Sequence, residues 1–331
     1  MTWQRGLSKV RDGAEPASLP SGMRLPAIFS ARELQVMEFP PVSWVIPGVL
    51  SEGLTLLAGK PKMGKSWLAL DLAVQVATGG EVLGRPVEEG RVLYAALEDN
   101  QRRLKSRLQK SALHQQEWPE KLHMATEWPR LDAGGLAALD KWLGQSRDAR
   151  LAILDTLATV KPHGRATDQQ YQSDYEALRG LHALANRLGI AIVVIHHLRK
   201  AESDDPFDAV SGSTGLTGAA DSTLVLQRTS EGKVLYGRGR DLVEFESAVS
   251  FDDETCRWSD LGRPGDVFGS ETRKAIREAL KAGNQTPKDI SEAADIDYDL
   301  CAKTLQRMAE GGEIQKGGRG RYRLTPDPLS M

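Results

Sequence analysis

The stretch GKPKMGKS, from Gly59 to Ser66, constrains the fold of this chain more than any other part of the sequence. It matches the pattern G-x-x-x-x-G-K-[S/T], follows the apolar run LTLLAG and opens the helical stretch KSWLALDLAVQVAT. A strand, a glycine-rich loop and a helix in this order are typical of a phosphate-binding P-loop. The alternative is a glycine turn with a coincidental lysine, and the flanking strand and helix favour the P-loop.

The residues of this loop have separable roles in holding a nucleotide. Gly59 and Gly64 permit the backbone angles that turn successive N–H groups toward one point. Lys65 reaches the β- and γ-phosphates, and the Ser66 hydroxyl is placed to bind Mg²⁺. We therefore expect ATP and Mg²⁺ as ligands. The predicted nucleotide-binding residues are Gly59, Lys60, Pro61, Lys62, Met63, Gly64, Lys65, Ser66 and Trp67.

Apolar runs alternate with amphipathic stretches from Gly53 to about Gly262, which predicts an α/β fold with a mostly parallel sheet flanked by helices. The expected parallel strands are residues 54–59, 91–97, 149–155, 191–197 and 222–228. The expected helices are residues 65–78, 100–111, 135–145 and 171–189. Two further runs, 233–241 and 247–253, are expected as antiparallel strands at the sheet edge.

The chain is long enough for two domains, with 331 residues and a formal net charge of −2. We expect a flexible arm over residues 1–40, an ATPase domain over 41–262 and a winged helix-turn-helix domain over 263–331. Two cysteines are too few for a disulfide framework, and neither an apolar signal core nor eighteen consecutive apolar residues occur. These features predict a cytoplasmic protein without a membrane partner.

Hydrolysis requires a carboxylate that orders the metal and a group that positions the attacking water. Asp155, at the end of the run LAILD, supplies the first at the carboxyl edge of the sheet beside Ser66. Thr156 follows it, so the water-positioning base must come from another strand. Glu98, at the end of VLYAALED, is the candidate, with Asp99 as the alternative. Asp99 also suits the N-cap of the following helix.

These motifs resemble those of the RecA-like P-loop ATPases, and within them the RepA-type (AAA_25-like) hexameric helicases and related ATPases of plasmids and phages. The resemblance covers about residues 41–250 and rests on WVIPGVLSEGLTLLAGKPKMGKS, YAALED, LAILDT, VVIHHLRK and SGSTGLTGAADSTLVLQR. It implies a RecA-like fold. It also implies that a polar residue at the end of VVIHH contacts the γ-phosphate. His197 matches that position, with His196 as the alternative.

The resemblance further implies that a neighbouring subunit supplies arginine to the transition state. In LYGRGRD, Arg238 and Arg240 alternate along an extended segment and match the paired basic residues of a late strand. An exposed salt-bridging strand is the alternative. We therefore expect a homo-oligomeric ring, a hexamer. The predicted catalytic set is Lys65, Glu98, Asp155, His197, Arg238 and Arg240.

Two long polar loops follow the strands that end at Asp155 and His197, and loops of this length in a compact domain are usually functional or disordered. By resemblance, they point toward single-stranded DNA. The candidate phosphate contacts are Arg199 and Lys200, together with Lys161 and Arg165. Acidic residues occupy half of the second loop, which opposes this role.

The C-terminal residues are typical of a winged helix-turn-helix. The first helix is expected to start with Ser270 as its cap, and the second has Thr286 as N-cap and Pro287 at its first position. The expected small core consists of Ile276, Leu280, Ile290, Cys301, Leu305 and Met308. The third helix and the wing carry the predicted duplex DNA contacts Lys303, Arg307, Lys316, Arg319 and Arg321. Docking of a protein or capping of an oligomer is the alternative role for this domain.

The sequence therefore favours a DNA-associated ATPase motor, a RepA-type helicase that serves the replication of a plasmid, phage or other mobile element. The alternative is an ATP-switched DNA-binding regulator or helicase loader, which requires the same pocket but does not unwind DNA. A small-molecule kinase on the same scaffold is disfavoured, because Glu98 and the histidine pair suit the activation of water.

Overall fold

The computed structural model describes residues 28–111, 117–162, 167–198, 205–210, 215–229 and 231–324. The chain divides into two compact units, Met1–Pro41 and Val42–Met331. The first unit contains the short helix α1 (Ala31–Gln35), which starts with a capping box. The Ser30 hydroxyl accepts a hydrogen bond from the Glu33 N–H, and the Glu33 carboxylate accepts one from the Ser30 N–H. Most of the predicted arm, residues 1–27, lies outside the described residues.

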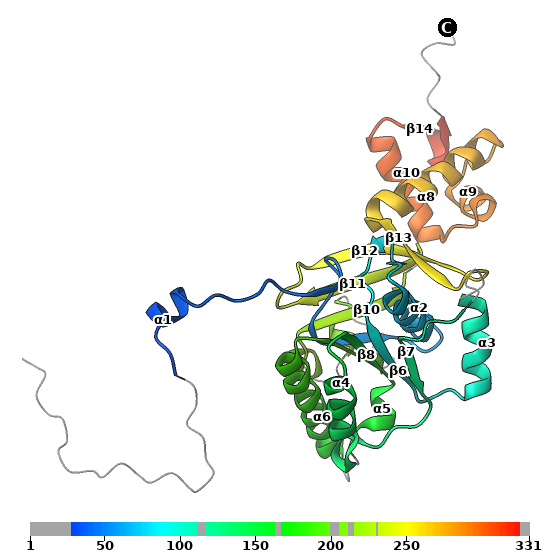
Figure 1. Cartoon of the computed structure of the whole chain (residues 1–331). Helices are drawn as coiled ribbons and strands as arrows, with labels where there is room; N and C mark the ends of the chain where they lie inside the picture. The colour runs from blue at the N-terminus through cyan, green and yellow to red at the C-terminus, as the bar shows by residue number, and fades with distance from the viewer. Residues whose placement is uncertain are drawn as a thin grey trace, which may run out of the picture. The chain divides into compact units, whose positions relative to one another are not determined.

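A nine-stranded sheet forms the centre of the second unit (Figure 1). Its order is β13-β12-β11-β10-β3-β9-β8-β6-β7. The strands from β10 to β7 in this order are parallel, and β11, β12 and β13 are antiparallel additions. The bounds are β3 (Gly53–Gly59), β6 (Arg91–Ala96), β7 (Leu122–Ala125), β8 (Ala149–Asp155), β9 (Ala191–His197), β10 (Ser222–Arg228), β11 (Lys233–Gly239), β12 (Phe245–Asp252) and β13 (Arg257–Gly262).

The central strands bury both of their faces, as a parallel sheet between two helical layers requires. Along β8, Leu151 and Ile153 belong to one core, whereas Ala152 and Leu154 belong to the other. Helices α2 (Lys65–Thr78) and α3 (Gln101–Ser111) contribute to the first core. Helices α4 (Gly135–Gly144) and α6 (Thr167–Leu188) contribute to the second, on the side where Figure 1 draws them together.

Shorter elements connect these layers. They are β1 (Trp44–Ile46), β2 (Leu50–Ser51), β4 (Glu81–Val82), β5 (Arg85–Pro86), η1 (Leu131–Ala133), α5 (Leu157–Val160), η2 (Asp208–Val210) and α7 (Gly215–Ala219). β1 pairs with β2, and β4 pairs with β5.

The predicted α/β sheet with flanking helices is confirmed, and the bounds of α2, β8, β9 and β10 are those expected from the sequence. β7 and β13 were not predicted. The proposed cap of α3 was wrong, because the side-chain oxygen of Asn100, and not Asp99, accepts the hydrogen bond from the Arg103 N–H at 2.9 Å.

The C-terminal residues form three helices and a two-stranded antiparallel sheet. Their bounds are α8 (Pro264–Lys281), α9 (Pro287–Ala294), α10 (Tyr298–Glu310), β14 (Ile314–Lys316), η3 (Gly318–Gly320) and β15 (Tyr322–Leu324). All six predicted core residues are buried there in one cluster, and Thr286 caps α9 as expected. The expected start at Ser270 was wrong, because Pro264 can occupy the first turn and α8 begins there. The assignment of these elements to a winged helix domain stays a prediction.

Among the described residues, no helix combines the length and the apolar character needed to cross a bilayer.

Candidate nucleotide-binding and hydrolysis site

The register of the sheet brings the ends of four parallel strands to one edge. Gly59 of β3 pairs with His197 of β9, and Asp155 of β8 pairs with Ala96 of β6. The strands β3, β9, β8 and β6 are consecutive in the sheet. Because parallel strands present their carboxyl ends at the same edge, the P-loop, His197, Asp155 and Glu98 meet there.

The P-loop has a shape that only glycine accommodates at two positions. Gly64 has a φ of 99°, and a Cβ at this position would lie 2.6 Å from Cζ2 of Trp258. A Cβ on Gly59 would lie 2.6 Å from the Leu226 carbonyl oxygen of β10. The loop is therefore packed against β10 and β13, and it places Gly64 as the N-cap of α2. Lys60, Pro61 and Lys62 are exposed on its outer side.

Lys65 is nearly enclosed, with 3% of its surface exposed. Its ammonium donates to the carbonyl oxygens of Gly59 at 2.7 Å and Lys60 at 3.1 Å, so it spans its own loop. Burial lowers the pKa of Lys65 to about 8, against the opposing effect of the charges of Asp155 and Glu98. A phosphate group would supply the negative charge that favours the protonated ammonium.

Asp155 is buried, and one of its two carboxylate oxygens is hydrogen-bonded. Oδ2 accepts a hydrogen bond from the Tyr94 hydroxyl at 3.0 Å, and the Ser66 side chain lies beside the carboxylate. Among the described residues, Oδ1 has no hydrogen-bond partner. Burial raises the pKa of Asp155, and its contacts with Ser66 and Tyr94 lower it. An unpartnered buried carboxylate oxygen beside a hydroxyl fits the oxygen ligands that Mg²⁺ prefers.

Glu98 and His197 face each other across this edge. Glu98 Oε1 accepts from the Thr156 hydroxyl at 3.1 Å and lies 3.6 Å from His197 Nε2. His197 Nδ1 lies 3.3 Å from Lys65 Nζ. Since an ammonium can only donate, this contact requires an unprotonated Nδ1 and leaves the imidazole proton on Nε2, toward Glu98. The carboxylate of Glu98 is half exposed, so it remains accessible to water.

Asp99 is committed to a structural role, unlike Glu98. It forms ion pairs with Arg103 at 3.0 Å and with Arg107 at 2.5 Å, which fix the start of α3. Arg107 in turn lies over the Trp67 ring, 5.2 Å from its centroid. The alternative of Asp99 as the water-positioning base has no support in these contacts.

Comparisons with known proteins identify the family of this chain. The model of the AAA_25 family, described as an AAA domain, matches residues 20–203. The chain belongs to the AAA_25 family. This AAA_25 protein is therefore a P-loop ATPase with a RecA-like fold. None of the curated proteins compared with it matches.

Two solved structures are similar to this AAA_25 protein. One is the ATPase domain of G40P, with a TM-score of 0.50 and 15% sequence identity over 63% of this chain and 85% of that chain. The other is a DnaB-like replicative helicase described together with its interactions with primase. Its TM-score is 0.49 and its identity 14%, and the match covers 62% of this chain and 57% of that chain. At 15% identity, the likeness to the ATPase domain of G40P concerns the fold alone.

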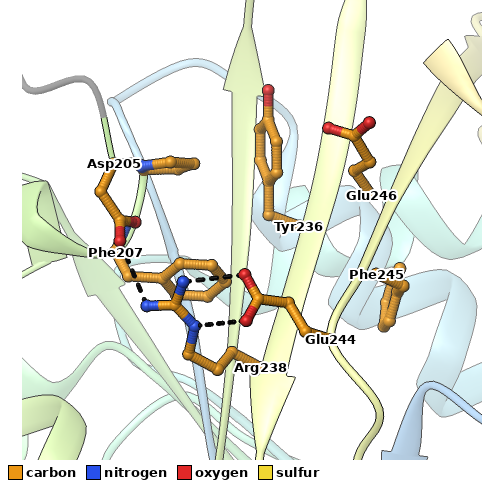
Figure 2. A pocket seen from close by; sticks show the side chains of 8 residues that line it. Asp205, Phe207, Tyr236, Arg238, Glu244, Phe245 and Glu246 are labelled. Carbon is orange, nitrogen blue, oxygen red and sulfur yellow. Dashed lines mark hydrogen bonds and ion pairs between the residues drawn. The ribbon is translucent and has the colours of Figure 1, made fainter. Parts of the chain in front are cut away.

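The two arginines predicted to act across subunits lie in different surroundings at the end of β11. Arg238 donates to both oxygens of Glu244, at 3.0 and 2.8 Å, and to Asp205 at 3.2 Å (Figure 2). Its guanidinium also lies 4.2 Å from the centroid of the Phe207 ring. Arg240 pairs with Asp221 at 3.2 Å. Within one chain, the ion pairs of both arginines are with carboxylates, and the described contacts of the two side chains do not include the P-loop.

The predicted DNA contacts lie partly outside the described residues. Arg165, Arg199 and Lys200 lie outside them, as does the side chain of Arg319, and Lys161 follows α5 with a half-buried side chain. The side chains of Lys303, Arg307, Lys316 and Arg321 are exposed in the C-terminal elements. Their role in binding DNA stays a prediction.

Three residues of the site were missed by the sequence analysis. Tyr94 and Thr156 hold the carboxylates of Asp155 and Glu98, and Trp258 packs against Gly64. The sequence does mark Tyr94, since it is the one hydroxyl-bearing side chain within the apolar run RVLYAAL. Nothing in the sequence marks Trp258, because its strand, β13, was not predicted.

Proposed function

We propose that this AAA_25 protein is an ATP-driven motor that acts on DNA, a RepA-type helicase for the replication of a mobile element. It works as a homo-oligomeric ring in which a neighbouring copy presents Arg238 and Arg240 to the nucleotide. The exposed basic side chains of α10 and the β14–β15 hairpin contact duplex DNA, and loops of the core contact a single strand.

Different residues of the site bind the phosphates and the metal, and others orient the attacking water. Lys65 and the P-loop N–H groups bind the β- and γ-phosphates. The Ser66 hydroxyl and Asp155 Oδ1 would hold Mg²⁺, which neutralises charge on the phosphates when bound. Glu98 orients the attacking water, and Thr156 and His197 fix the direction of its carboxylate. Arginine from the neighbour stabilises the charge that spreads over the transferring phosphoryl group.

The observation that carries this proposal is the chain of contacts from Lys65 through His197 to Glu98, at 3.3 and 3.6 Å. It connects the phosphate-binding lysine to a half-exposed carboxylate at the same sheet edge as Asp155. Because the Glu98 carboxylate is half exposed, water reaches it, whereas a protein that transfers phosphate to another substrate should keep water away from the phosphates.

A strand-displacement assay on forked DNA tests the proposal. The wild-type protein with ATP and Mg²⁺ is expected to release phosphate and to separate the strands, whereas Lys65→Ala should do neither. Phosphate release without strand separation would support the ATP-switched regulator or loader instead. A phosphorylated acceptor molecule with no free phosphate would contradict hydrolysis altogether.

A further inference from the structure

A pocket of about 630 Å³ lies on β11 and β12, next to the segment that carries Phe207 (Figure 2). Its apolar wall includes the rings of Phe207, Tyr236 and Phe245. Its charged residues are Asp205, Arg238, Glu244 and Glu246. Tyr236 and Glu246 are direct cross-strand partners, which puts a carboxylate beside an aromatic ring.

The charges of this pocket are unbalanced. Arg238 compensates Glu244, which it binds through both oxygens, and it shares a further hydrogen bond with Asp205. Glu246 is exposed and forms no ion pair with any of the described residues. Three carboxylates against one guanidinium leave the pocket with negative charge. The charge of Glu246 adds to the effect of burial in raising the pKa of the Tyr236 phenol.

The chemistry of the pocket selects a cationic side chain as its occupant. Aromatic faces attract cations, and an apolar wall accepts the carbon stem of lysine or arginine. The carboxylates repel the phosphates of a nucleic acid. A basic helix of a protein therefore fits the pocket better than DNA does.

The basic helix that fits is found in the chain itself. α3 carries five basic residues and no acidic residue between Gln101 and Ser111. Leu104 and Leu108 face the core, and Arg103 and Arg107 are paired with Asp99. The remaining basic side chains are exposed and have no ion pair within the described part of the chain. They are Arg102, Lys105 and Lys110.

We infer that the pocket between β11, β12 and Phe207 receives the basic face of α3 from a second copy of this chain. This inference rests on the proposed ring. α3 begins three residues after Glu98, so the contact would bring the hydrolysis site of the second copy to the surface that carries Arg238. The pocket and α3 share no residue, so each copy can use both at once. Such a head-to-tail contact repeats into a ring or a filament.

Charge reversal on the two sides tests this contact in the full-length protein. Glu246→Lys reverses a charge in the pocket, and Arg102→Glu with Lys105→Glu reverses two charges on α3. Mass photometry with a non-hydrolysable ATP analogue and Mg²⁺ measures the concentration of half-maximal assembly. Because like charges are then opposed, each reversal is expected to raise this concentration at least about tenfold. The three substitutions together should return it to within about threefold of wild type.

A control variant shows whether the effect of charge reversal is specific to the pocket and α3. Glu120→Lys reverses an exposed acidic residue without an ion pair in the described structure, and assembly should not change. The contact alone would be overturned if the charge reversals left the concentration of half-maximal assembly unchanged. It would also be overturned if the triple variant assembled no more readily than the variants reversed on one side. Wild-type protein that stays monomeric would overturn the ring and the contact together.

Discussion

Tyr94 holds the predicted metal ligand from inside the sheet. Its hydroxyl donates to Asp155 Oδ2 at 3.0 Å, and both side chains are buried. The contact leaves Oδ1 as the oxygen without a partner among the described residues. A hydrogen bond of this kind orients a metal-binding carboxylate, and such contacts contribute to metal affinity although they do not touch the metal.

We therefore expect Tyr94→Phe to raise the Mg²⁺ concentration needed for half-maximal ATPase activity about ten- to hundredfold. The activity at saturating Mg²⁺ should fall much less, because the hydrolytic groups are retained. A Mg²⁺ titration of phosphate release measures this shift, with Tyr298→Phe at an exposed position as the control. An unchanged Mg²⁺ requirement would assign Tyr94 to packing alone.

Most of the site could be predicted at this scale, because its residues stand at fixed places relative to apolar runs. Lys65, Glu98, Asp155 and His197 each follow or end a buried strand, and parallel strands must end at a common edge. The supporting contacts could not be predicted. The hydrogen bond from Thr156 to Glu98 depends on how β6 lies beside β8, which the residue pattern does not specify.

At the scale of elements, a buried carboxylate ties the P-loop helix to the outermost strand. Asp71 of α2 is 1% exposed, and its Oδ2 accepts a hydrogen bond from the Trp258 N–H of β13 at 3.2 Å. Arg257 Nε, on the same strand, lies 3.6 Å from Asp71 Oδ1. Because Trp258 also packs against Gly64, this contact connects β13 to the phosphate-binding loop.

Asp71 should make the stability of the fold depend on pH. Burial raises the pKa of Asp71 to about 6 from its ordinary 3.8, so the folded state holds this proton more tightly than the unfolded state does. As the pH rises from about 4 to 6, the unfolded chain ionises first and the free energy of unfolding falls. By pH 7 this loss amounts to about 3 kcal/mol.

Asp71→Asn keeps an oxygen that can accept from Trp258 and removes the ionisable group. Urea unfolding at pH 4, 5, 6 and 7 should show that wild type loses stability relative to Asp71→Asn across this range. Asp253→Asn, a substitution at an exposed position, is the control, and its stability should change with pH in parallel with that of wild type. A constant difference between wild type and Asp71→Asn from pH 4 to 7 would show that folding does not shift the pKa of Asp71.

The elements that the sequence predicted are those with a strong pattern of their own. β8, β9 and β10 are built around short apolar runs, and α2 is a mostly apolar stretch that directly follows the P-loop. β7, with all four residues half-buried, and β13, with the sequence RWSDLG, lack such a pattern. β13 becomes a strand through its pairing with β12 and the burial of Trp258, which are tertiary effects.

At the scale of the whole molecule, the near-neutral net charge conceals separate charged surfaces. α3 and the β14–β15 hairpin are basic in sequence, and the pocket on β11 and β12 is acidic. These surfaces have different expected partners, since a phosphate backbone binds basic side chains and a basic helix binds carboxylates. Salt should weaken both kinds of contact.

Lys303→Ala with Arg307→Ala tests the role of α10 in binding duplex DNA. If both side chains contact phosphates, the slope of log affinity against log salt concentration should become shallower by about 1.8. Fluorescence anisotropy with a labelled duplex over a range of salt concentrations measures the slope, and Lys141→Ala on α4 is the control. An unchanged slope would favour a protein-docking role for these helices.

The central claim is that one edge of the sheet unites phosphate binding with the activation of water, and Glu98→Gln tests it most directly. The variant keeps the size of the side chain and removes its charge. Nucleotide binding and phosphate release are measured on the same full-length protein. Nucleotide affinity is predicted to stay within about threefold of wild type, and phosphate release to fall at least about a hundredfold. Phosphate release near the wild-type rate would contradict the account.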